Sequence, residues 1–222
     1  FEKEVEIIID NALREAVGEG DHSSLACIPK EAHGKAKLLV KDEGVLAGVD
    51  FARRVFQKVD PEIKMEVLIE DGARVKKRDV AFLVEGRSQS ILKAERLVLN
   101  GMQRMSAIAT KTRTFVDRLE GTNTKILDTR KTTPGLRRLE KKAVALGGGT
   151  NHRMGLYDMI MLKDNHIDFA GGINQAIRKT LKYLQKKEMD TLIEFEVRSL
   201  DEVKQVLDIG GVDRVMLDNF SP

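Results

Sequence analysis

Four short apolar runs, separated by helical segments, constrain the fold of this chain more than any other feature. The runs are residues 125–128, 159–162, 191–197 and 214–217, and helical spacing lies between them near 135–146, 173–187 and 200–209. Strands that alternate with helices form parallel sheets, because each helix carries the chain back to the edge where the previous strand began. The pattern predicts an α/β fold with a parallel sheet after Gly121.

The first hundred residues mix strands and helices without strict alternation. Helical spacing predicts helices at 2–18, 49–59 and 88–119, and apolar runs predict strands at 35–41, 64–70 and 80–85. We expect an N-terminal α+β sandwich-like domain over 1–107 and a TIM-like parallel α/β barrel over 108–222. A closed barrel needs roughly three or four more strands, so we expect an incomplete barrel whose C-terminal strands are missing from this sequence.

Composition excludes several classes of protein. No run of 18 apolar residues occurs, so we expect no membrane-spanning helix. The single cysteine, Cys27, cannot form an internal disulfide, which favours a reducing cytoplasm. The residues also contain no Cys and His cluster with the spacing of zinc ligands. A net charge of +3, from 38 basic and 35 acidic residues, is too balanced to indicate a nucleic-acid partner.

Positive charge gathers where polar residues follow the apolar runs. Residues 125–166 contain nine Lys or Arg and four Asp or Glu, which gives +5 in 42 residues. The four runs are followed or ended by Asp128-Thr-Arg-Lys131, Lys163-Asp-Asn-His166, Glu196 and Asp218-Asn219. Because ligands of parallel sheets bind at the carboxyl ends of the strands, four polar ends in series predict a site there.

Two segments in this region carry residues suited to anions. Arg130 and Lys131 follow a predicted strand, and arginine grips carboxylate or phosphate bidentately while lysine acts as a point charge. The alternative for this segment is a solvated basic loop. The glycines of Gly147-Gly-Gly-Thr-Asn-His-Arg153 permit close backbone approach and could offer N–H groups to an anion. The alternative for the glycines is a flexible end to the preceding helix.

Lys163 leaves a buried strand and is either a Schiff-base nucleophile or an anion ligand. The neighbouring cations favour the anion ligand, because Arg130, Lys131 and Arg153 would form with Lys163 a crowded cationic pocket that suits a polyanionic substrate. Glu196 and Asp218 indicate magnesium, ribose hydroxyls or charge balance for the lysines, with plain salt bridging as the alternative.

Four motifs together resemble those of the quinolinate phosphoribosyltransferases, also called carboxylating nicotinate-nucleotide pyrophosphorylases. They are Asn100-Gly-Met-Gln-Arg-Met-Ser-Ala-Ile-Ala-Thr110, Asp128-Thr-Arg-Lys-Thr-Thr-Pro-Gly135, Gly148-Gly-Thr-Asn-His-Arg153 and Leu162-Lys-Asp-Asn-His166. Gly18-Glu-Gly-Asp-His-Ser-Ser24 also fits the family, with His22 where an aliphatic residue is usual, and Ala107 replaces a usual Gly. We expect the family's C-terminal portion, which carries a phosphate loop with the sequence Gly-Gly-Ile, to be missing from this sequence.

The resemblance implies a reaction, a set of ligands and an assembly. Quinolinate and phosphoribosyl pyrophosphate would give nicotinate mononucleotide, pyrophosphate and CO₂, with Mg²⁺ as cofactor. The family's substrate ligands fall on Arg104, Arg130, Lys131, His152, Arg153 and Lys163, and its acidic pair, which could hold the Mg²⁺, falls on Glu196 and Asp218. Lys131, Lys163, Glu196 and Asp218 are then the expected catalytic residues. Because the family's counterpart of Arg104 reaches the partner subunit's site, a homodimer is implied.

Three other functions stay open at this point. A Schiff-base aldolase would use Lys163 as nucleophile, although further cations beside it serve a dianion better than a neutral carbonyl. A non-enzymatic module that binds anions or nucleic acid would need aromatic residues for stacking. Aromatic residues are only 5% of the chain, which disfavours this alternative. A divergent paralogue could act on another anionic pyridine or on an oxyanion.

Overall fold

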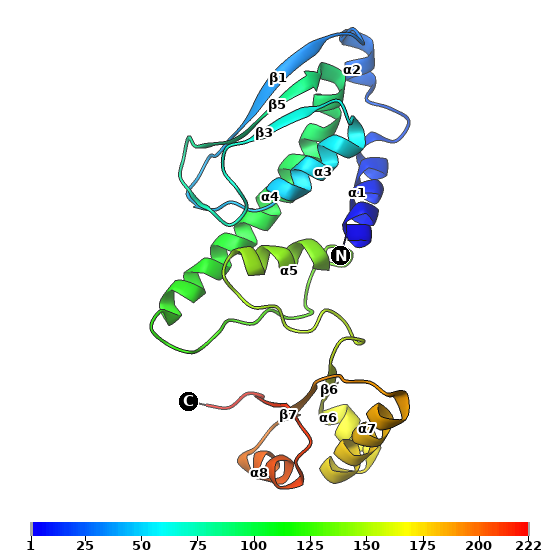
Figure 1. Cartoon of the computed structure of the whole chain (residues 1–222), viewed down its shortest axis with the longest axis vertical. Coiled ribbons are helices and arrows are strands. Elements are labelled where there is room, and N and C mark those ends of the chain that lie inside the picture. The colour runs from blue at the N-terminus through cyan, green and yellow to red at the C-terminus, as the bar shows by residue number, and fades with distance from the viewer. Residues whose placement is uncertain (1, 222) are drawn as a thin grey trace. The chain divides into compact units, whose positions relative to one another are not determined.

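The structure, a computed structural model, describes residues 2–221 and divides into two compact units, Phe1–His152 and Arg153–Pro222 (Figure 1). Each unit has its own hydrophobic core. The domain boundary predicted at residues 107/108 lies inside a single continuous helix, Ser88–Val116, and stays a prediction. Within the described residues, no helix combines the length and the apolar character needed to cross a membrane.

The first unit mixes helices and strands, as predicted, and the structure shows that its strands pair antiparallel. Its sheet has the strand order β1-β5-β3, and β2 pairs separately with β4. The elements are α1 (Glu2–Val17), α2 (His22–Cys27), β1 (His33–Leu39), β2 (Gly44–Val45), α3 (Val49–Val59), β3 (Lys64–Val67), β4 (Arg74–Val75), β5 (Val80–Arg87), α4 (Ser88–Val116), the 3-10 helix η1 (Asp117–Leu119) and α5 (Arg137–Leu146).

Helix α3 has the bounds that its periodicity predicts. It begins after Gly48, whose φ of 103° is open to glycine at little cost. The carboxylate of Asp71 accepts hydrogen bonds from the backbone N–H groups of Gly48, Val49 and Asp50, at 2.6, 2.8 and 3.2 Å. These are donors that the first turn of a helix cannot satisfy by itself. The helix ends at Val59, as expected two residues before a proline.

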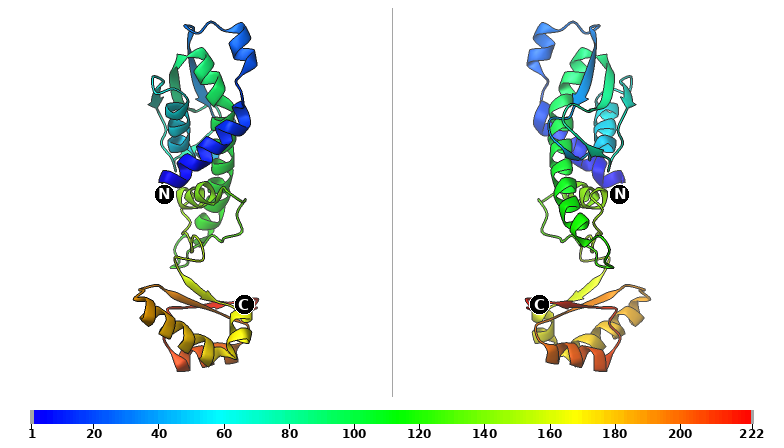
Figure 2. Two further views of the ribbon diagram at one scale, coloured as in Figure 1. Left: turned by 90° about the vertical axis from the view of Figure 1, so that its right-hand side faces the viewer. Right: turned by 90° about the vertical axis from the view of Figure 1, so that its left-hand side faces the viewer.

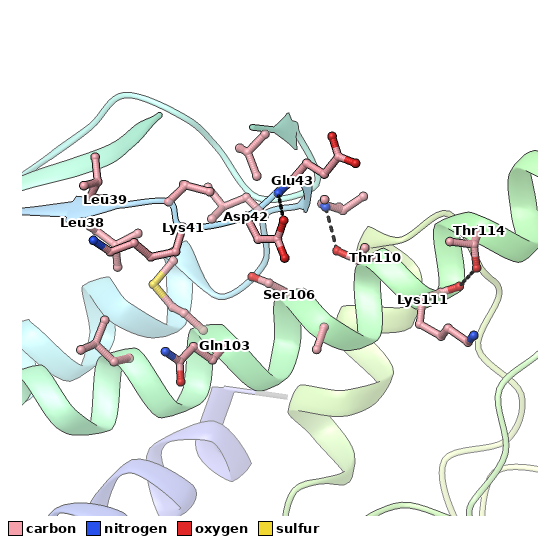
Figure 3. A pocket seen from close by; sticks show the side chains of 18 residues that line it. Leu38, Leu39, Lys41, Asp42, Glu43, Gln103, Ser106, Thr110, Lys111 and Thr114 are labelled. Carbon is pink, nitrogen blue, oxygen red and sulfur yellow. Dashed lines mark hydrogen bonds between the residues drawn. The ribbon is translucent and has the colours of Figure 1, made fainter. Parts of the chain in front are cut away.

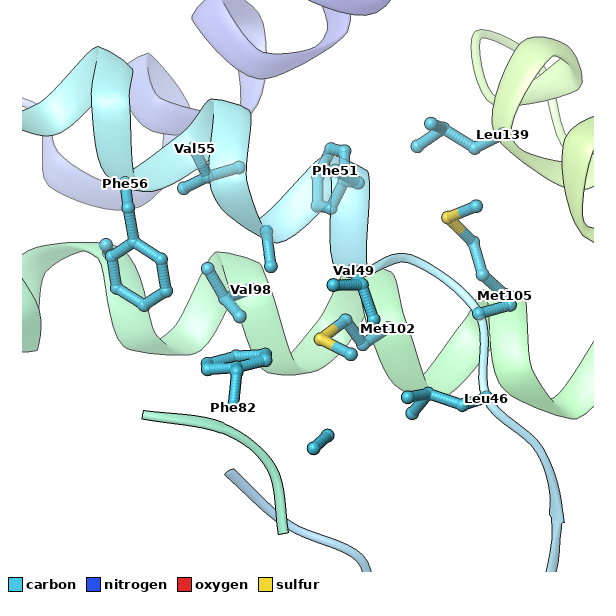
Figure 4. Packing of buried hydrophobic residues seen from close by; sticks show 14 of the residues in the cluster. Leu46, Val49, Phe51, Val55, Phe56, Phe82, Val98, Met102, Met105 and Leu139 are labelled. Carbon is cyan, nitrogen blue, oxygen red and sulfur yellow. The ribbon is translucent and has the colours of Figure 1, made fainter. Parts of the chain in front are cut away.

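The core of the first unit forms where α3 and α4 cross next to β5 (Figure 4). Phe56 of α3 meets Phe82 of β5 edge-to-face, with ring centroids 6.2 Å apart and planes at 82°. This is a favourable arrangement for two aromatic quadrupoles. Gly101 of α4 allows the close approach of the two helices, because a Cβ built on it would lie 2.2 Å from Cε1 of Phe51.

The second unit is built on a parallel sheet with the order β6-β7-β8, which confirms the predicted parallel pairing for three strands. Its elements are β6 (Ile160–Leu162), α6 (Asp164–Ala170), α7 (Ile173–Lys187), β7 (Ile193–Val197), α8 (Leu200–Ile209) and β8 (Arg214–Leu217). Its helices cover one side of the sheet (Figure 2). Closure into a barrel stays a prediction.

The prediction of a strand at residues 125–128 is wrong. Leu127 and Thr150 form a single parallel bridge, in which Ile126 accepts from the N–H of Thr150 at 2.8 Å and Asp128 donates to its carbonyl at 3.1 Å. The residue opposite belongs to a loop rather than to a strand, so no ladder extends in either direction. Sequence reasoning also missed two short helices, α2 and α6, and α6 takes up most of the segment predicted as a polar strand end after Lys163.

Candidate functional site

The basic loop after Asp128 is ordered by side-chain hydrogen bonds to its backbone. The backbone N–H of Lys131 donates to the hydroxyl of Thr129 at 3.0 Å, and the carbonyl of Arg130 accepts from Nη2 of Arg137 at 3.2 Å. Arg130 is half-buried, whereas Lys131 is exposed. The loop therefore has a defined shape and presents two adjacent cations of different accessibility, which a mobile solvated loop would not.

Arg104 of α4 is joined to the same loop through a buried acid. Its Nε donates to Oε1 of Glu140 at 2.8 Å, and its Nη2 donates to Oε1 at 2.5 Å and to the hydroxyl of Thr133. The other oxygen of Glu140 accepts from the backbone N–H of Thr133 at 3.2 Å. The Glu140 side chain is 10% exposed and that of Arg104 is 48% exposed, so the guanidinium is oriented but still accessible.

The glycine run after α5 does not offer its N–H groups to an anion, so that expectation is wrong. The amides of Gly147, Gly148 and Gly149 donate to the carbonyls of Ala143, Ala145 and Val144 at 2.9 to 3.0 Å. The alternative, a helix end, is confirmed. The glycines are needed for packing, because a Cβ on Gly147 would lie 2.5 Å from the carbonyl oxygen of Ala109 on α4.

A buried ion pair lies beneath the loop and was missed at the sequence level. Nζ of Lys141 on α5 pairs with Oδ1 of Asp128 and also donates to the carbonyl of His152 at 3.0 Å. The same carboxylate oxygen accepts from the backbone N–H of His152 at 2.8 Å. The only available signal was helical spacing. It places Glu140 on the same face of α5 as Ala143, and Lys141 is the next residue.

The second unit aligns three of the predicted residues along one edge of its sheet. Lys163 follows β6, Glu196 lies in β7 and Asp218 follows β8. Lys163 and Glu196 form an ion pair, and the backbone N–H of Asp218 donates to the carbonyl of Val197 at 3.0 Å. These are the carboxyl ends of parallel strands, where the sequence predicted a site.

Alternation along the strands places these three side chains on the face of the sheet opposite the helices. Leu162 pairs in register with Phe195, and both belong to the core beneath α6 to α8. The next residues along the two strands, Lys163 and Glu196, therefore point to the other face. Glu196 pairs with Met216, so Asp218, two residues further, lies on this same face.

Arg153 begins the second unit and is buried there, with Nη1 donating to the carbonyl of Met159 at 3.3 Å. The eight predicted residues thus divide between the units. The first unit holds Arg104, Arg130, Lys131 and His152, and the second holds Arg153, Lys163, Glu196 and Asp218. Within the units, the structure links Arg104 to the basic loop and Lys163 to Glu196. A single pocket formed by all eight stays a prediction.

Within residues 2–221, no three His, Cys, Asp or Glu side chains converge as a protein-only metal site would require.

A pocket of about 560 Å³ lies between residues 38–46 and α4, lined mostly by apolar atoms (Figure 3). None of the eight predicted residues lines it, so this pocket is distinct from the predicted site.

Comparisons with known proteins agree along the whole chain. The family model "Quinolinate phosphoribosyl transferase, N-terminal domain" matches residues 21–106, and the model of the C-terminal domain matches residues 108–222. Over 96% of its length the chain is 44% identical to "Quinolinate phosphoribosyltransferase [decarboxylating] 1b" of Nicotiana tabacum. Over 98% of its length it is 44% identical to "Nicotinate-nucleotide pyrophosphorylase [carboxylating], chloroplastic" of Arabidopsis thaliana.

A solved structure, that of NadC from Streptococcus pyogenes, covers the whole chain at a TM-score of 0.92 and 38% identity, and the chain covers 77% of NadC. The chain spans 62% and 64% of the two plant relatives.

Proposed function

Because the chain belongs to the quinolinate phosphoribosyltransferase family, we propose that it transfers phosphoribosyl from phosphoribosyl pyrophosphate to quinolinate. The transfer is accompanied by decarboxylation and gives nicotinate mononucleotide, pyrophosphate and CO₂. The observation that carries the proposal is the shared edge of the second unit's sheet, where Lys163, Glu196 and Asp218 follow or end three neighbouring parallel strands. In such a group, the lysine can bind the phosphate of an anionic sugar phosphate, and the two carboxylates can accept hydrogen bonds from the sugar hydroxyls.

Binding of the two polyanions is the first task of the site. We assign the dicarboxylate and the phosphates to Arg130, Lys131, His152, Arg153 and Lys163, with Arg104 as a further cation. Arginine holds a carboxylate in a fixed plane, so the pyridine nitrogen can be held facing C1 of the ribose. The ordered loop around Arg130 supports this role, because its hydrogen bonds fix the backbone that carries the two cations.

The chemistry then needs charge stabilisation more than proton transfer. The C1–O bond to pyrophosphate breaks with its electron pair leaving on pyrophosphate, and the ring nitrogen forms the new bond to the electron-poor C1. Cations placed where the negative charge develops lower the barrier. The ring is now a cation, so the C2–carboxylate bond can break with its electrons entering the ring, and a proton from solvent takes the place of CO₂.

The acidic pair suits a magnesium ion that arrives with its substrate. Mg²⁺ in such sites is held by one or two carboxylates together with substrate phosphates, and Glu196 and Asp218 supply two carboxylates at adjacent strand ends. When bound, the ion would offset the charge of the departing pyrophosphate.

Lys163 fits this role better than that of a Schiff-base nucleophile. Its ammonium is paired with the Glu196 carboxylate, and a nucleophilic lysine has to present a neutral amine. The aldolase alternative therefore loses support.

We further propose a homodimer in which Arg104 serves the partner subunit's site. Glu140 orients the guanidinium while leaving it 48% exposed. A half-exposed, pre-oriented arginine is suited to a ligand in a neighbouring subunit. We also propose a reducing cytoplasm, because Cys27 is exposed and has no disulfide partner.

Quinolinate labelled with ¹⁴C in its 2-carboxylate tests the reaction with the full-length enzyme. Label should be released only when phosphoribosyl pyrophosphate and Mg²⁺ are both present, since the free ring has no strong electron sink. Nicotinate should be a poor substrate, because a cation left unpaired in a desolvated pocket costs about 1–3 kcal/mol or more. Lys131→Ala should lose most turnover while keeping the fold. Release of label without phosphoribosyl pyrophosphate, or equal use of nicotinate, would overturn the assignment.

A further inference from the structure

We propose that Lys141 is a positioning residue, which holds the loop of Arg130 and Lys131 in a fixed relation to the segment of His152 without touching substrate. The inference rests on the proposed function for its activity readout. It concerns a charge that the proposed chemistry leaves unused, since Lys141 is buried with only 1% of its side chain exposed.

Three connections meet at the Lys141 ammonium and its partner. Asp128, which pairs with Nζ, lies two residues before Arg130 and so fixes the start of the basic loop. The carbonyl of His152 accepts from Nζ at 3.0 Å, while its N–H donates to Asp128 at 2.8 Å. One ion pair therefore satisfies both backbone polar groups of His152 and fixes the position of this residue.

Asn151 strengthens the same arrangement. With its amide nitrogen turned toward the two acceptors, it donates to Oδ2 of Asp128 at 2.7 Å and to the backbone carbonyl of Lys141 at 2.9 Å. Asp128 thus uses both carboxylate oxygens to hold the segment before Arg153. A carboxylate that accepts from three groups defines a geometry much more narrowly than an apolar contact does.

The far end of the basic loop is held by the residue next to Lys141 on α5. Glu140 accepts from the backbone N–H of Thr133 at 3.2 Å and pairs with Arg104. Two consecutive buried charges on one helix therefore fix both ends of the loop 128–133. Burying an ion pair is a poor way to gain stability, because apolar residues of similar volume are often as good or better. The pair is better explained by the geometry that it enforces.

Two variants of the full-length enzyme separate positioning from stability. Lys141→Met removes the ammonium and leaves the Asp128 carboxylate buried and unpaired. The double variant Asp128→Asn/Lys141→Met removes both charges but keeps an amide oxygen for the N–H of His152. Asp60→Asn is the matched control, since Asp60 is another buried carboxylate, 1% exposed, paired with an arginine at a different place in the first unit.

We expect Lys141→Met to lose both stability and activity. In the double variant, stability should return toward that of the wild type, while kcat/KM stays down by about 10²-fold, as for a displacement of about 1 Å at reacting groups. Asp60→Asn should lose stability and keep kcat/KM within about twofold. If the activity of the double variant recovers together with its melting temperature, Lys141 is structural only and the inference is wrong.

A second readout does not depend on which reaction the enzyme performs. The imidazole ¹³C–¹H signal of His152, assigned with His152→Asn, should move in both Lys141 variants and stay unchanged in Asp60→Asn. An unchanged His152 signal in folded Lys141 variants would overturn the inference. A wild-type enzyme that releases no CO₂ from quinolinate would overturn the proposed function, and the His152 signal would still decide the role of Lys141.

Discussion

Gly101→Ala tests the closest helix contact in the first unit. An alanine Cβ would lie 2.2 Å from Cε1 and 2.7 Å from Cδ1 of Phe51, a ring that is almost fully buried between α3 and α4. Carbon atoms in contact lie about 3.5–4.0 Å apart, so the ring or the helix has to move by more than about 1 Å. Overpacking of this kind costs about 1–3 kcal/mol, against a gain of about 1 kcal/mol from replacing Gly inside a helix.

We therefore expect a net loss of up to about 2 kcal/mol, read from urea unfolding monitored by circular dichroism. Asn100→Ala is the control, since Asn100 is exposed on the same helix and its replacement should be neutral or slightly stabilising. Combining Gly101→Ala with Phe51→Leu should cost less than the sum of the two single changes, because the smaller side chain gives room for the Cβ.

The position also bears on activity, since Arg104 lies one turn further along α4. A shift of the helix should therefore raise KM in Gly101→Ala and leave it unchanged in Asn100→Ala. If Gly101→Ala proves as stable as Asn100→Ala, the packing argument is refuted.

The other predictions concern charges. Arg130→Ala should abolish turnover with an unchanged fold, through a loss of about 2–4 kcal/mol of transition-state stabilisation. If this variant turns over substrate as fast as the wild type, Arg130 is not part of the site. Arg104→Ala and Lys163→Ala, each inactive alone, should regain partial activity as verified heterodimers if each site borrows Arg104, and inactive heterodimers would refute sharing. The pKa of Asp60 is lowered well below its usual range, mainly by the hydrogen bond from Arg87. The contribution of the ionised Asp60 carboxylate to the free energy of unfolding is therefore complete above the ordinary carboxyl pKa, and it is lost as pH falls toward the lowered pKa. The free energy of unfolding of Asp60→Asn should accordingly depend less on pH than that of the wild type between about pH 4 and 2.

Local patterns were sufficient for the elements that carry much of the predicted site. The bounds of α3, α7, α8 and β8 follow from residue periodicity alone, because the spacing of apolar side chains is a property of neighbouring residues. The positions of Lys163, Glu196 and Asp218 at one sheet edge follow from the same patterns, because parallel strands separated by helices end on the same side.

What only the tertiary structure decided depends on partners distant in the sequence. Residues 125–128 have the composition of a strand, but a strand needs another strand to pair with, and here it meets one residue of a loop. The three glycines could have bound an anion, but their amides are used within the chain. The buried charges of Glu140 and Lys141 were not predicted at all. Their partners, Arg104 and Asp128, lie 36 and 13 residues away, and no local periodicity records which distant charge comes to lie beside a helix.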